Sequence, residues 1–162
     1  MEFKISGVLP SDLVDILRLN ESEVPRLGPA DLGLMQWFAD NAAYFGVARH
    51  EQRLAAFLVG LRPGIDYASP NYRWFCDRYD DFAYVDRVAV AEDYRRHRLA
   101  SRLYEAFAVS VPKSIEFMTC EVNTKPPNEE SMRFHTQLGF EQVGTLVSEN
   151  ETKQVALLAR KL

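Results

Sequence analysis

The most informative part of the chain is the run Val88-Ala89-Val90, followed by Tyr94-Arg95-Arg96-His97-Arg98-Leu99-Ala100-Ser101. A β-branched strand ends at Val90, and a polar turn then opens an amphipathic helix that we expect over residues 96–109. A strand that leads into a basic turn at a helix N-terminus presents free backbone N–H groups and the positive end of the helix dipole. The sequence therefore predicts a phosphate or pyrophosphate site at this turn.

The bulk composition is typical of a soluble globular protein. The 162 residues carry a formal net charge of -4, with 47% hydrophobic and 26% charged residues. An acidic total argues against a general nucleic-acid coat, and the longest apolar run, residues 54–61, is too short to span a bilayer. The two cysteines show no metal-like spacing and favour unpaired thiols in a reducing compartment. We expect one cytoplasmic domain over residues 1–162, with no metal site, no membrane contact and no nucleic-acid partner.

The pattern of apolar residues and breakers predicts an α/β fold (an α+β mixed sheet) of about six to seven strands flanked by about four helices. Strands are expected at residues 3–8, 44–49, 54–61, 82–90, 115–122, 140–147 and 154–162. Helices are expected after residues 10–12, at about 29–42, at 96–109, and from 126–128 to Gly139. Residues 62–80 contain Pro63, Gly64 and Pro70 among many aromatics and are expected to be irregular.

Residues 88–100 resemble the acetyl-CoA motif of the GNAT superfamily of N-acetyltransferases. The family pattern is Q/R-x-x-G-x-G/A after a Val-rich strand, and Arg95, Arg98 and Ala100 fall on its three fixed positions. A second family signature is resembled by Glu121-Val122-Asn123, Asn128, Ser131, Phe134, His135 and Leu138-Gly139-Phe140. Both signatures in order make the resemblance specific, and the element order of the N-terminal half agrees with the fold.

Arg98 departs from the family pattern because it stands at the first glycine position of the phosphate loop. If the chain is helical at this point, an outward-pointing side chain leaves the N–H groups accessible, and Ala100 keeps the small size of its position. We expect a working loop, and the alternative is weakened or lost cofactor binding.

The resemblance implies acetyl-CoA as the cofactor. The backbone amides of about residues 96–101 would bind the pyrophosphate, and main-chain groups of Val88 and Val90 would bind the pantetheine arm by β-augmentation. The complete set of expected cofactor-binding residues is Val88, Ala89, Val90, Arg95, Arg96, His97, Arg98, Leu99, Ala100, Ser101, Asn123, Asn128 and Ser131.

The chemistry of acetyl transfer to an amine requires placement of the reactants and removal of a proton. Asp86 is the first candidate base, because it shares a strand face with Tyr84, Val88 and Val90. The alternative is that Asp86 pairs with a cation and holds the strand. Tyr84 could line the substrate cleft or relay a proton through water. His135 stands where the family usually has a tyrosine general acid, and could donate a proton or only contact the cofactor.

The acceptor site is expected near the aromatic segment before the motif strand, with Tyr72 and Trp74 as contacts and acidic neighbours that favour a cationic amine. Asn20 and Glu21, in the loop expected after the first helix, could close the other side. The resemblance leaves open a small amine, an amino acid, an antibiotic or a protein N-terminus as acceptor. It also allows a homodimer.

We therefore expect an acetyl-CoA-dependent N-acetyltransferase that acts by direct transfer in a ternary complex on a small-molecule or peptide amine. Arg98 and His135 keep a second hypothesis open, a non-catalytic acyl-CoA-sensing module with the same pocket. A nucleic-acid-binding protein is a third hypothesis that rests on the arginine-rich turn alone, and the acidic total disfavours it.

Overall fold

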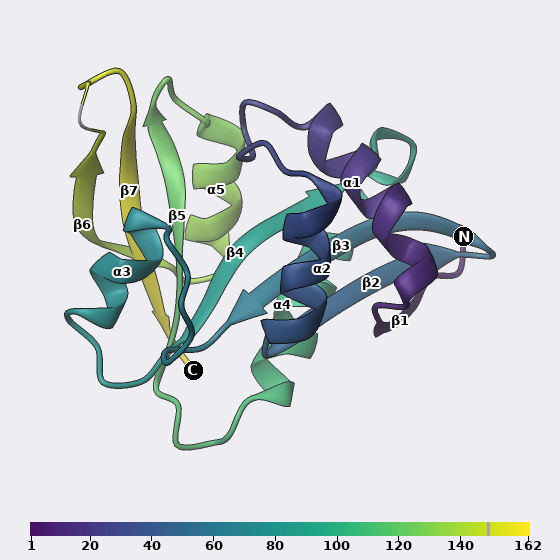
Figure 1. Ribbon diagram of the computed structural model, residues 1–162, viewed down its shortest axis with the longest axis horizontal. Coiled ribbons are helices and arrows are strands. Elements are labelled where there is room, and N and C mark those ends of the chain that lie inside the picture. The colour runs from purple at the N-terminus through teal and green to yellow at the C-terminus, as the bar shows by residue number, and fades with distance from the viewer. Residues whose placement is uncertain (149) are drawn as a thin grey trace. The chain divides into compact units, whose positions relative to one another are not determined.

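The computed structural model describes residues 1–148 and 150–162. In these residues the chain forms seven β-strands, five α-helices and two short 3-10 helices (Figure 1). In chain order they are β1 (Lys4–Gly7), η1 (Pro10–Asp12), α1 (Leu13–Ser22), α2 (Leu32–Asn41), β2 (Tyr44–His50), β3 (Arg53–Leu61), α3 (Pro70–Cys76), β4 (Ala83–Val90), η2 (Glu92–Tyr94), α4 (Leu99–Ser110), β5 (Phe117–Lys125), α5 (Glu129–Gln137), β6 (Glu141–Val147) and β7 (Gln154–Lys161). Among the described helices, none is long and apolar enough to cross a membrane.

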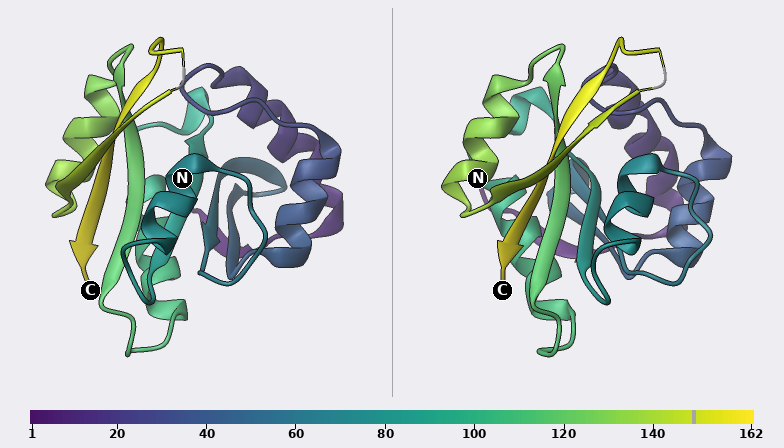
Figure 2. Two further views of the ribbon diagram at one scale, coloured as in Figure 1. Left: turned by 60° about the vertical axis from the view of Figure 1, so that its left-hand side comes forward. Right: turned by 90° about the vertical axis from the view of Figure 1, so that its left-hand side faces the viewer.

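The strands form one mixed sheet in the order β1-β2-β3-β4-β5-β7-β6. β4 and β5 pair in parallel, with Ala83 opposite Met118 and Tyr84 opposite Thr119. The pairs β1–β2, β2–β3, β5–β7 and β6–β7 are antiparallel. Figure 2 shows β7 beside β5 in both views, and β6 pairs with the other edge of β7. The predicted mixed α/β sheet is confirmed. It has seven strands, within the expected number, and the described residues form five α-helices, one more than expected.

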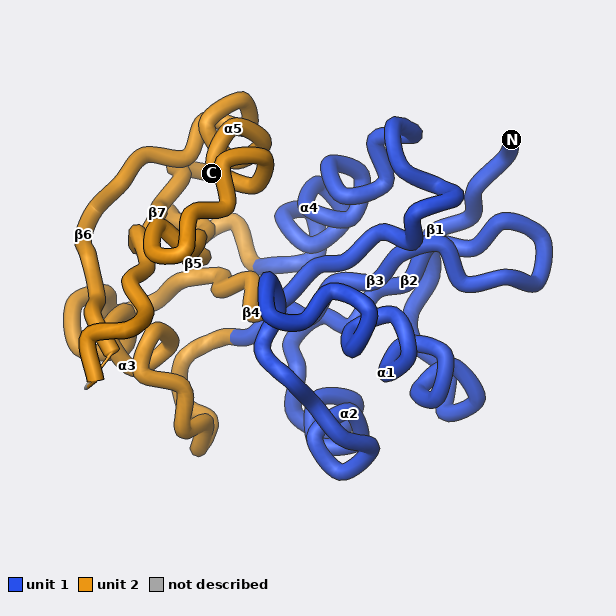
Figure 3. The backbone as a smooth tube through the Cα atoms, turned by 90° about the horizontal axis from the view of Figure 1, so that it is seen from above, with its two compact units in different colours: residues 1–61, 87–111 blue, residues 62–86, 112–162 orange. Residues whose placement is uncertain are grey.

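The contacts within the chain group into two compact units, coloured in Figure 3. The first comprises residues 1–61 and 87–111, and the second residues 62–86 and 112–162. In the first unit the apolar face of α4 packs on β2 and β3, and the Phe107 ring stacks on Tyr44 with 5.4 Å between centroids. The fully buried Phe107 ring lies directly against the backbone of Gly60.

The core of the second unit includes an aromatic cluster in which Phe75 of α3 contacts Phe82 and Tyr84, with ring centroids 5.9 Å apart in both pairs. The expectation of an irregular segment over residues 62–80 is wrong for Pro70–Cys76. Ser69 is the N-cap of α3, since its hydroxyl accepts from the Tyr72 N–H at 3.3 Å, and Pro70 occupies the first turn. The local start signal for this helix was therefore present in the sequence.

Substitution of Gly60 by alanine is expected to lower the free energy of unfolding by about 1–3 kcal/mol, because the added Cβ would lie 2.5 Å from two atoms of the buried Phe107 ring. Gly7→Ala is the matched control, since Gly7 is also in a strand and its Cβ would meet no atom of the described residues within 4 Å. Denaturant unfolding measures the free energy of unfolding of both variants. Equal stabilities would contradict the packing of α4 on β3.

Candidate functional site

The turn between β4 and α4 has an unusual backbone. The Ala91 N–H donates to the Ala55 carbonyl at 2.8 Å, which anchors the end of β4 to β3. Beyond η2, Arg96 and Arg98 adopt left-handed conformations with φ of 67° and 59°. The helix therefore begins at Leu99, and the prediction of a helix from residue 96 with a helical Arg98 is wrong. Arg98 keeps the conformation that glycine adopts easily, at a cost of about 1–2 kcal/mol.

The N-terminus of α4 presents backbone donors. The first intrahelical bond runs from the Arg102 N–H to the Arg98 carbonyl at 3.0 Å, so the N–H groups of Leu99, Ala100 and Ser101 precede the helical ladder. Within the described residues, no side chain caps this end. Three N–H groups at the positive end of a helix dipole suit a diphosphate. The predicted phosphate turn thus has the donors that such a ligand needs.

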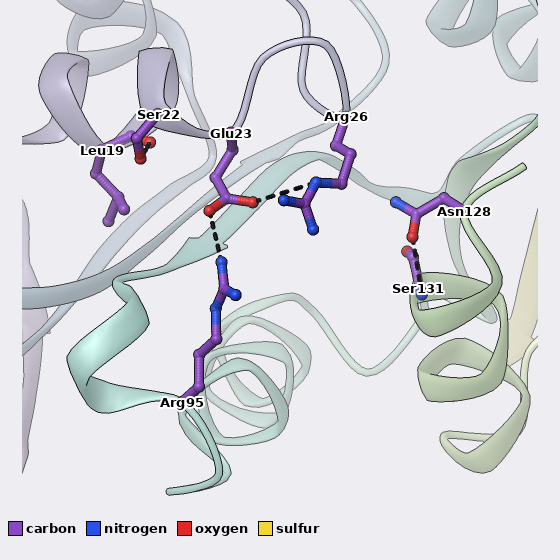
Figure 4. Close-up of polar contacts among 7 residues, drawn as sticks. All are labelled: Leu19, Ser22, Glu23, Arg26, Arg95, Asn128 and Ser131. Carbon is purple, nitrogen blue, oxygen red and sulfur yellow. Dashed lines mark hydrogen bonds and ion pairs between the residues drawn. The ribbon is translucent and has the colours of Figure 1, made fainter. Parts of the chain in front are cut away.

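Arg95 lies beside this turn and is held by an acidic partner. Its Nη2 atom lies 2.8 Å from Oε1 of Glu23, the residue that follows α1, and Oε2 of Glu23 lies 3.8 Å from Nε of Arg26 (Figure 4). One carboxylate thus lies between two guanidinium groups, which leaves a local excess of positive charge. Arg96, His97 and Arg98 are exposed. This charge favours an anionic ligand.

The two faces of β4 differ in exposure. Val85, Arg87 and Ala89 are buried, whereas Asp86, Val88 and Val90 are partly exposed. The predicted face that Asp86 shares with Val88 and Val90 is therefore confirmed. Tyr84 is fully buried, so its side chain does not line an open surface.

The Tyr84 hydroxyl donates to the carboxylate of Glu121, a residue that belongs to the second signature but was not among the expected site residues. Its Oη lies 2.6 Å from Oε2 of Glu121, in β5. Asn71, in the first turn of α3, also donates a side-chain hydrogen bond to Glu121. The strand expected over residues 115–122 contains two acidic residues, Glu116 and Glu121, of which Glu116 is exposed and Glu121 lies between the buried Cys120 and Val122. An acidic residue within such a strand was the available signal.

Burial, which disfavours a charged carboxylate, and the negative charge of Asp86 raise the pKa of Glu121 to about 8. The hydrogen bonds from Tyr84 and Asn71 and the charge of Lys153 oppose this rise. Burial, followed by the charge of Glu121, raises the pKa of the Tyr84 phenol well above its usual range, so this hydroxyl remains protonated. A carboxyl group that titrates near neutral pH suits a general base.

His135 is buried in α5, with 3% of its surface exposed. Its Nδ1 lies 2.7 Å from the Ser131 carbonyl oxygen, and Phe134 and Phe140 flank the ring. Burial lowers the pKa of His135 below 6.5, against the opposing effect of this backbone bond. A carbonyl can only accept, so Nδ1 carries the proton and Nε2 of the neutral ring is an acceptor. This tautomer favours an anchoring or cofactor-contact role over proton donation.

The remaining cofactor candidates lie at the end of β5 and the start of α5. Asn123 lies within β5 opposite Val155, because the strand continues to Lys125 and does not end at residue 122 as expected. Asn128 is the N-cap of α5, and its Oδ1 accepts from the Ser131 N–H at 3.2 Å (Figure 4). The predicted helix start at Asn128 is confirmed, and the cofactor contacts of these residues stay predictions.

The first pair of acceptor candidates lies in a helix. Asn20 and Glu21 belong to α1, which continues to Ser22, and not to a following loop. Asn20 is fully buried, and its Oδ1 accepts from Nη1 of Arg87 at 3.0 Å. The Glu21 carboxylate accepts from the Ala30 N–H at 2.9 Å. Both side chains therefore order the connection between α1 and α2, and acceptor contact by them stays a prediction.

The second pair of acceptor candidates lies in α3. Tyr72 is 2% exposed, and its hydroxyl donates to the Arg62 carbonyl at 2.8 Å. Trp74 lies so close to Gly144 of β6 that a Cβ there would clash with its ring, and Arg78 stacks over the same ring at 4.1 Å. Both side chains pack α3 within the second unit, and acceptor binding by them also stays a prediction.

The model of the acetyltransferase (GNAT) family matches residues 11–140. No curated protein matches the chain.

Many solved structures share the fold. Ard1 from Thermoplasma volcanium aligns with a TM-score of 0.79 and 19% identity over 100% of this chain and 99% of that one. NAA60 from Arabidopsis thaliana, in complex with a bisubstrate analogue, gives a TM-score of 0.78 and 16% identity over 99% and 98% of the two chains. The same plant protein in complex with acetyl-CoA gives a TM-score of 0.76 and 14% identity, with 99% of each chain covered. At these identities the likeness establishes the fold.

Arg98→Gly is expected to raise the free energy of unfolding by about 1 kcal/mol, because glycine adopts the left-handed conformation without steric cost. Arg102→Gly, the same change inside α4, is the control and is expected to lower stability by about 1 kcal/mol. Thermal and denaturant unfolding measure both. A destabilised Arg98→Gly variant would show that the Arg98 backbone is unstrained.

The His135 ring is expected to be neutral at pH 7 and protonated on Nδ1, because it is buried and donates to the Ser131 carbonyl. Nitrogen-15 NMR of the histidine side chains reports both the tautomer and the titration midpoint, with the exposed His97 ring as an internal comparison. An imidazolium signal from His135 at pH 7 would restore the general-acid hypothesis.

Proposed function

Because the chain belongs to the acetyltransferase (GNAT) family, we propose that it transfers an acetyl group from acetyl-CoA to a primary amine of a small molecule or peptide. The observation that carries the proposal is the open N-terminus of α4, where three backbone N–H groups precede the helical ladder beside a basic turn. The acetyl-CoA complex of the structurally similar plant protein supports this choice of cofactor.

The residues of the turn fit the cofactor chemically. The N–H groups of Leu99, Ala100 and Ser101 would hold the pyrophosphate, and the excess positive charge around Arg95 would favour it. Main-chain groups of Val88 and Val90 would hold the pantetheine arm, and Asn123, Asn128 and Ser131 remain further contacts in this proposal. When bound, acetyl-CoA supplies a thioester, an acyl group activated for attack by an amine.

Glu121 is the residue we assign to proton removal. An amine is protonated near neutral pH and must lose a proton before or during attack. The Glu121 carboxylate accepts this proton, and its raised pKa matches it to a proton donor of similar strength. Asp86, the base expected from the sequence, acts in this scheme through its charge, which favours the protonated form of Glu121. Tyr84 orients the carboxylate by donating to Oε2.

His135 acts in this proposal as an anchor of α5. Its neutral ring donates from Nδ1 to the Ser131 carbonyl, and its Nε2 is an acceptor. Direct transfer in a ternary complex needs no covalent nucleophile from the protein. Cys120 lies buried within β5, in keeping with a packing role.

The Glu121→Gln variant is expected to bind acetyl-CoA as tightly as the wild type but to lose about 10²–10⁴-fold in turnover, because the amide cannot accept a proton. Calorimetry measures binding, and thiol release over small amines, amino acids and peptide N-termini measures turnover. In the wild type, kcat/KM should rise with pH and level off above about 8, since only the ionised Glu121 is active.

An acceptor with an amine pKa well below 7 is the control for this pH dependence, because its own ionisation then contributes no change near pH 8. Unchanged turnover in Glu121→Gln would remove Glu121 from the mechanism. Wild-type binding of acetyl-CoA without thiol release for any amine would instead support the acyl-CoA-sensing alternative. Failure to bind acetyl-CoA would overturn the proposal.

A further inference from the structure

Glu23, the residue that follows α1, has a backbone that is fixed on both sides. Its N–H donates to the Asn20 carbonyl, and its own carbonyl accepts from the Leu27 N–H, both at 3.0 Å. Only 15% of its side chain is exposed, and glutamate side chains this far from solvent are generally paired. The Glu23 carboxylate therefore has a defined position at the end of α1.

A buried polar network fastens this end of α1 to β4. Asn20, in the last turn of α1, is fully buried, and its Oδ1 accepts from Nη1 of Arg87 at 3.0 Å. The Asn20 Nδ2 donates to the Gly28 carbonyl at 3.1 Å, and the Arg87 guanidinium lies 4.9 Å from the centroid of the Phe38 ring. Buried hydrogen bonds of this kind fix the geometry of the segments they join. Glu23 is thus held against the strand that leads into the basic turn.

The Glu23 carboxylate contacts the first residue of the basic turn. Its Oε1 accepts from Nη2 of Arg95 at 2.8 Å, across 72 residues of chain (Figure 4). Arg95 directly precedes Arg96, and both Arg96 and Arg98 have a left-handed backbone. Such a strained backbone persists only where the surrounding structure fixes it. The pair between Glu23 and Arg95 is one contact from outside the turn that does so.

The contact with Glu23 leaves Arg95 able to bind an anion. A guanidinium has five N–H donors, and Nη2 is the nitrogen that reaches Glu23. The Arg95 side chain is 38% exposed, so part of it remains accessible to a ligand. The second oxygen of Glu23 lies 3.8 Å from Nε of Arg26, beyond hydrogen-bond distance, so Arg95 is the stronger partner.

We propose that Glu23 is a positioning residue, whose carboxylate holds the Arg95 guanidinium and so preorganises the basic turn at residues 95–98 for an anionic ligand. Its importance for acetyl transfer rests on the proposed function, in which this turn binds the cofactor's diphosphate. A preorganised site loses less conformational entropy on binding and so binds more tightly. As a simple counter-charge, the same carboxylate would weaken anion binding. The two roles therefore predict opposite effects when the carboxylate is removed.

The test is calorimetric binding of coenzyme A to the full chain in about 0.5 M salt, where the Debye length is about 4 Å and a change in net charge contributes little. Glu23→Ala is expected to weaken binding about tenfold, because Arg95 and the turn lose their anchor. Glu23→Gln should bind within about threefold of the wild type, since its amide oxygen still accepts from Arg95. In the enzyme assay, KM for acetyl-CoA should rise in Glu23→Ala while kcat stays constant.

Asp15→Ala is the matched control and should leave the affinity for coenzyme A unchanged. It removes the same charge from α1 and breaks an ion pair of 2.9 Å to Arg18, whose side chains are both largely exposed. In an Arg95→Ala background, Glu23→Ala should cause no further weakening, because Glu23 acts through Arg95. Unfolding curves show whether each variant is folded, and Glu23→Leu, which keeps the side-chain bulk without an acceptor, serves where Glu23→Ala is not.

Unchanged or tighter binding in Glu23→Ala would overturn the positioning role and leave Glu23 as a counter-charge. An equal weakening with and without the Arg95 side chain would overturn it too, because Glu23 would then act elsewhere. Nitrogen-15 relaxation of the amides of residues 95–98 in the ligand-free protein separates this role from the proposed function. In Glu23→Ala their order parameters should fall from about 0.85 towards about 0.6, even if the wild type fails to bind coenzyme A, and unchanged values would overturn the role.

Discussion

A carboxylate that lies between buried neighbours in a strand loses hydration, and this loss disfavours its charged form. Glu121 lies between buried neighbours in β5, and burial together with the Asp86 charge favours its protonated form. The Tyr84 hydroxyl and the Asn71 amide stabilise its ionised form. The balance leaves a group that exchanges a proton near neutral pH. The rings of Tyr72 and Phe75 in α3 pack against Tyr84, whose hydroxyl donates to Glu121.

In the first unit, backbone strain and N–H groups outside the helical ladder occur together at the turn before α4. The left-handed backbone of Arg98 stores conformational strain, and the first three N–H groups of α4 are left outside the helical ladder. Both features cost stability in the folded chain. Their benefit is a concentrated set of donors at the end of β4, and the Glu23 carboxylate holds Arg95 beside them. Strain and open donors at one turn are expected where a protein binds an anion.

The sequence predicted the elements that depend on local spacing. The strand ending at Val90, the helix start at Asn128 and the helix end before Gly139 were all readable, because each depends on residues within one turn of chain. The left-handed conformation of Arg98 could not be predicted in this way, because an arginine at this position favours a helical backbone. The α3 helix had a readable start at Ser69-Pro70, which the nearby breakers and aromatics obscured. The sequence placed Glu121 within the second signature, but it did not show which residues surround its side chain in the fold.

The sequence alone thus determined the order of the strands and of every α-helix except α3, the position of the basic turn before α4 and the resemblance to acetyltransferases. Tertiary structure alone decided that the pKa of the Glu121 carboxyl is raised. Asn71, Tyr84 and Glu121 come from three separate elements, and the shift in the pKa of Glu121 depends on burial and through-space charge. Local propensity acts over a few residues of chain, whereas desolvation and Coulomb interactions act between residues that only folding brings together.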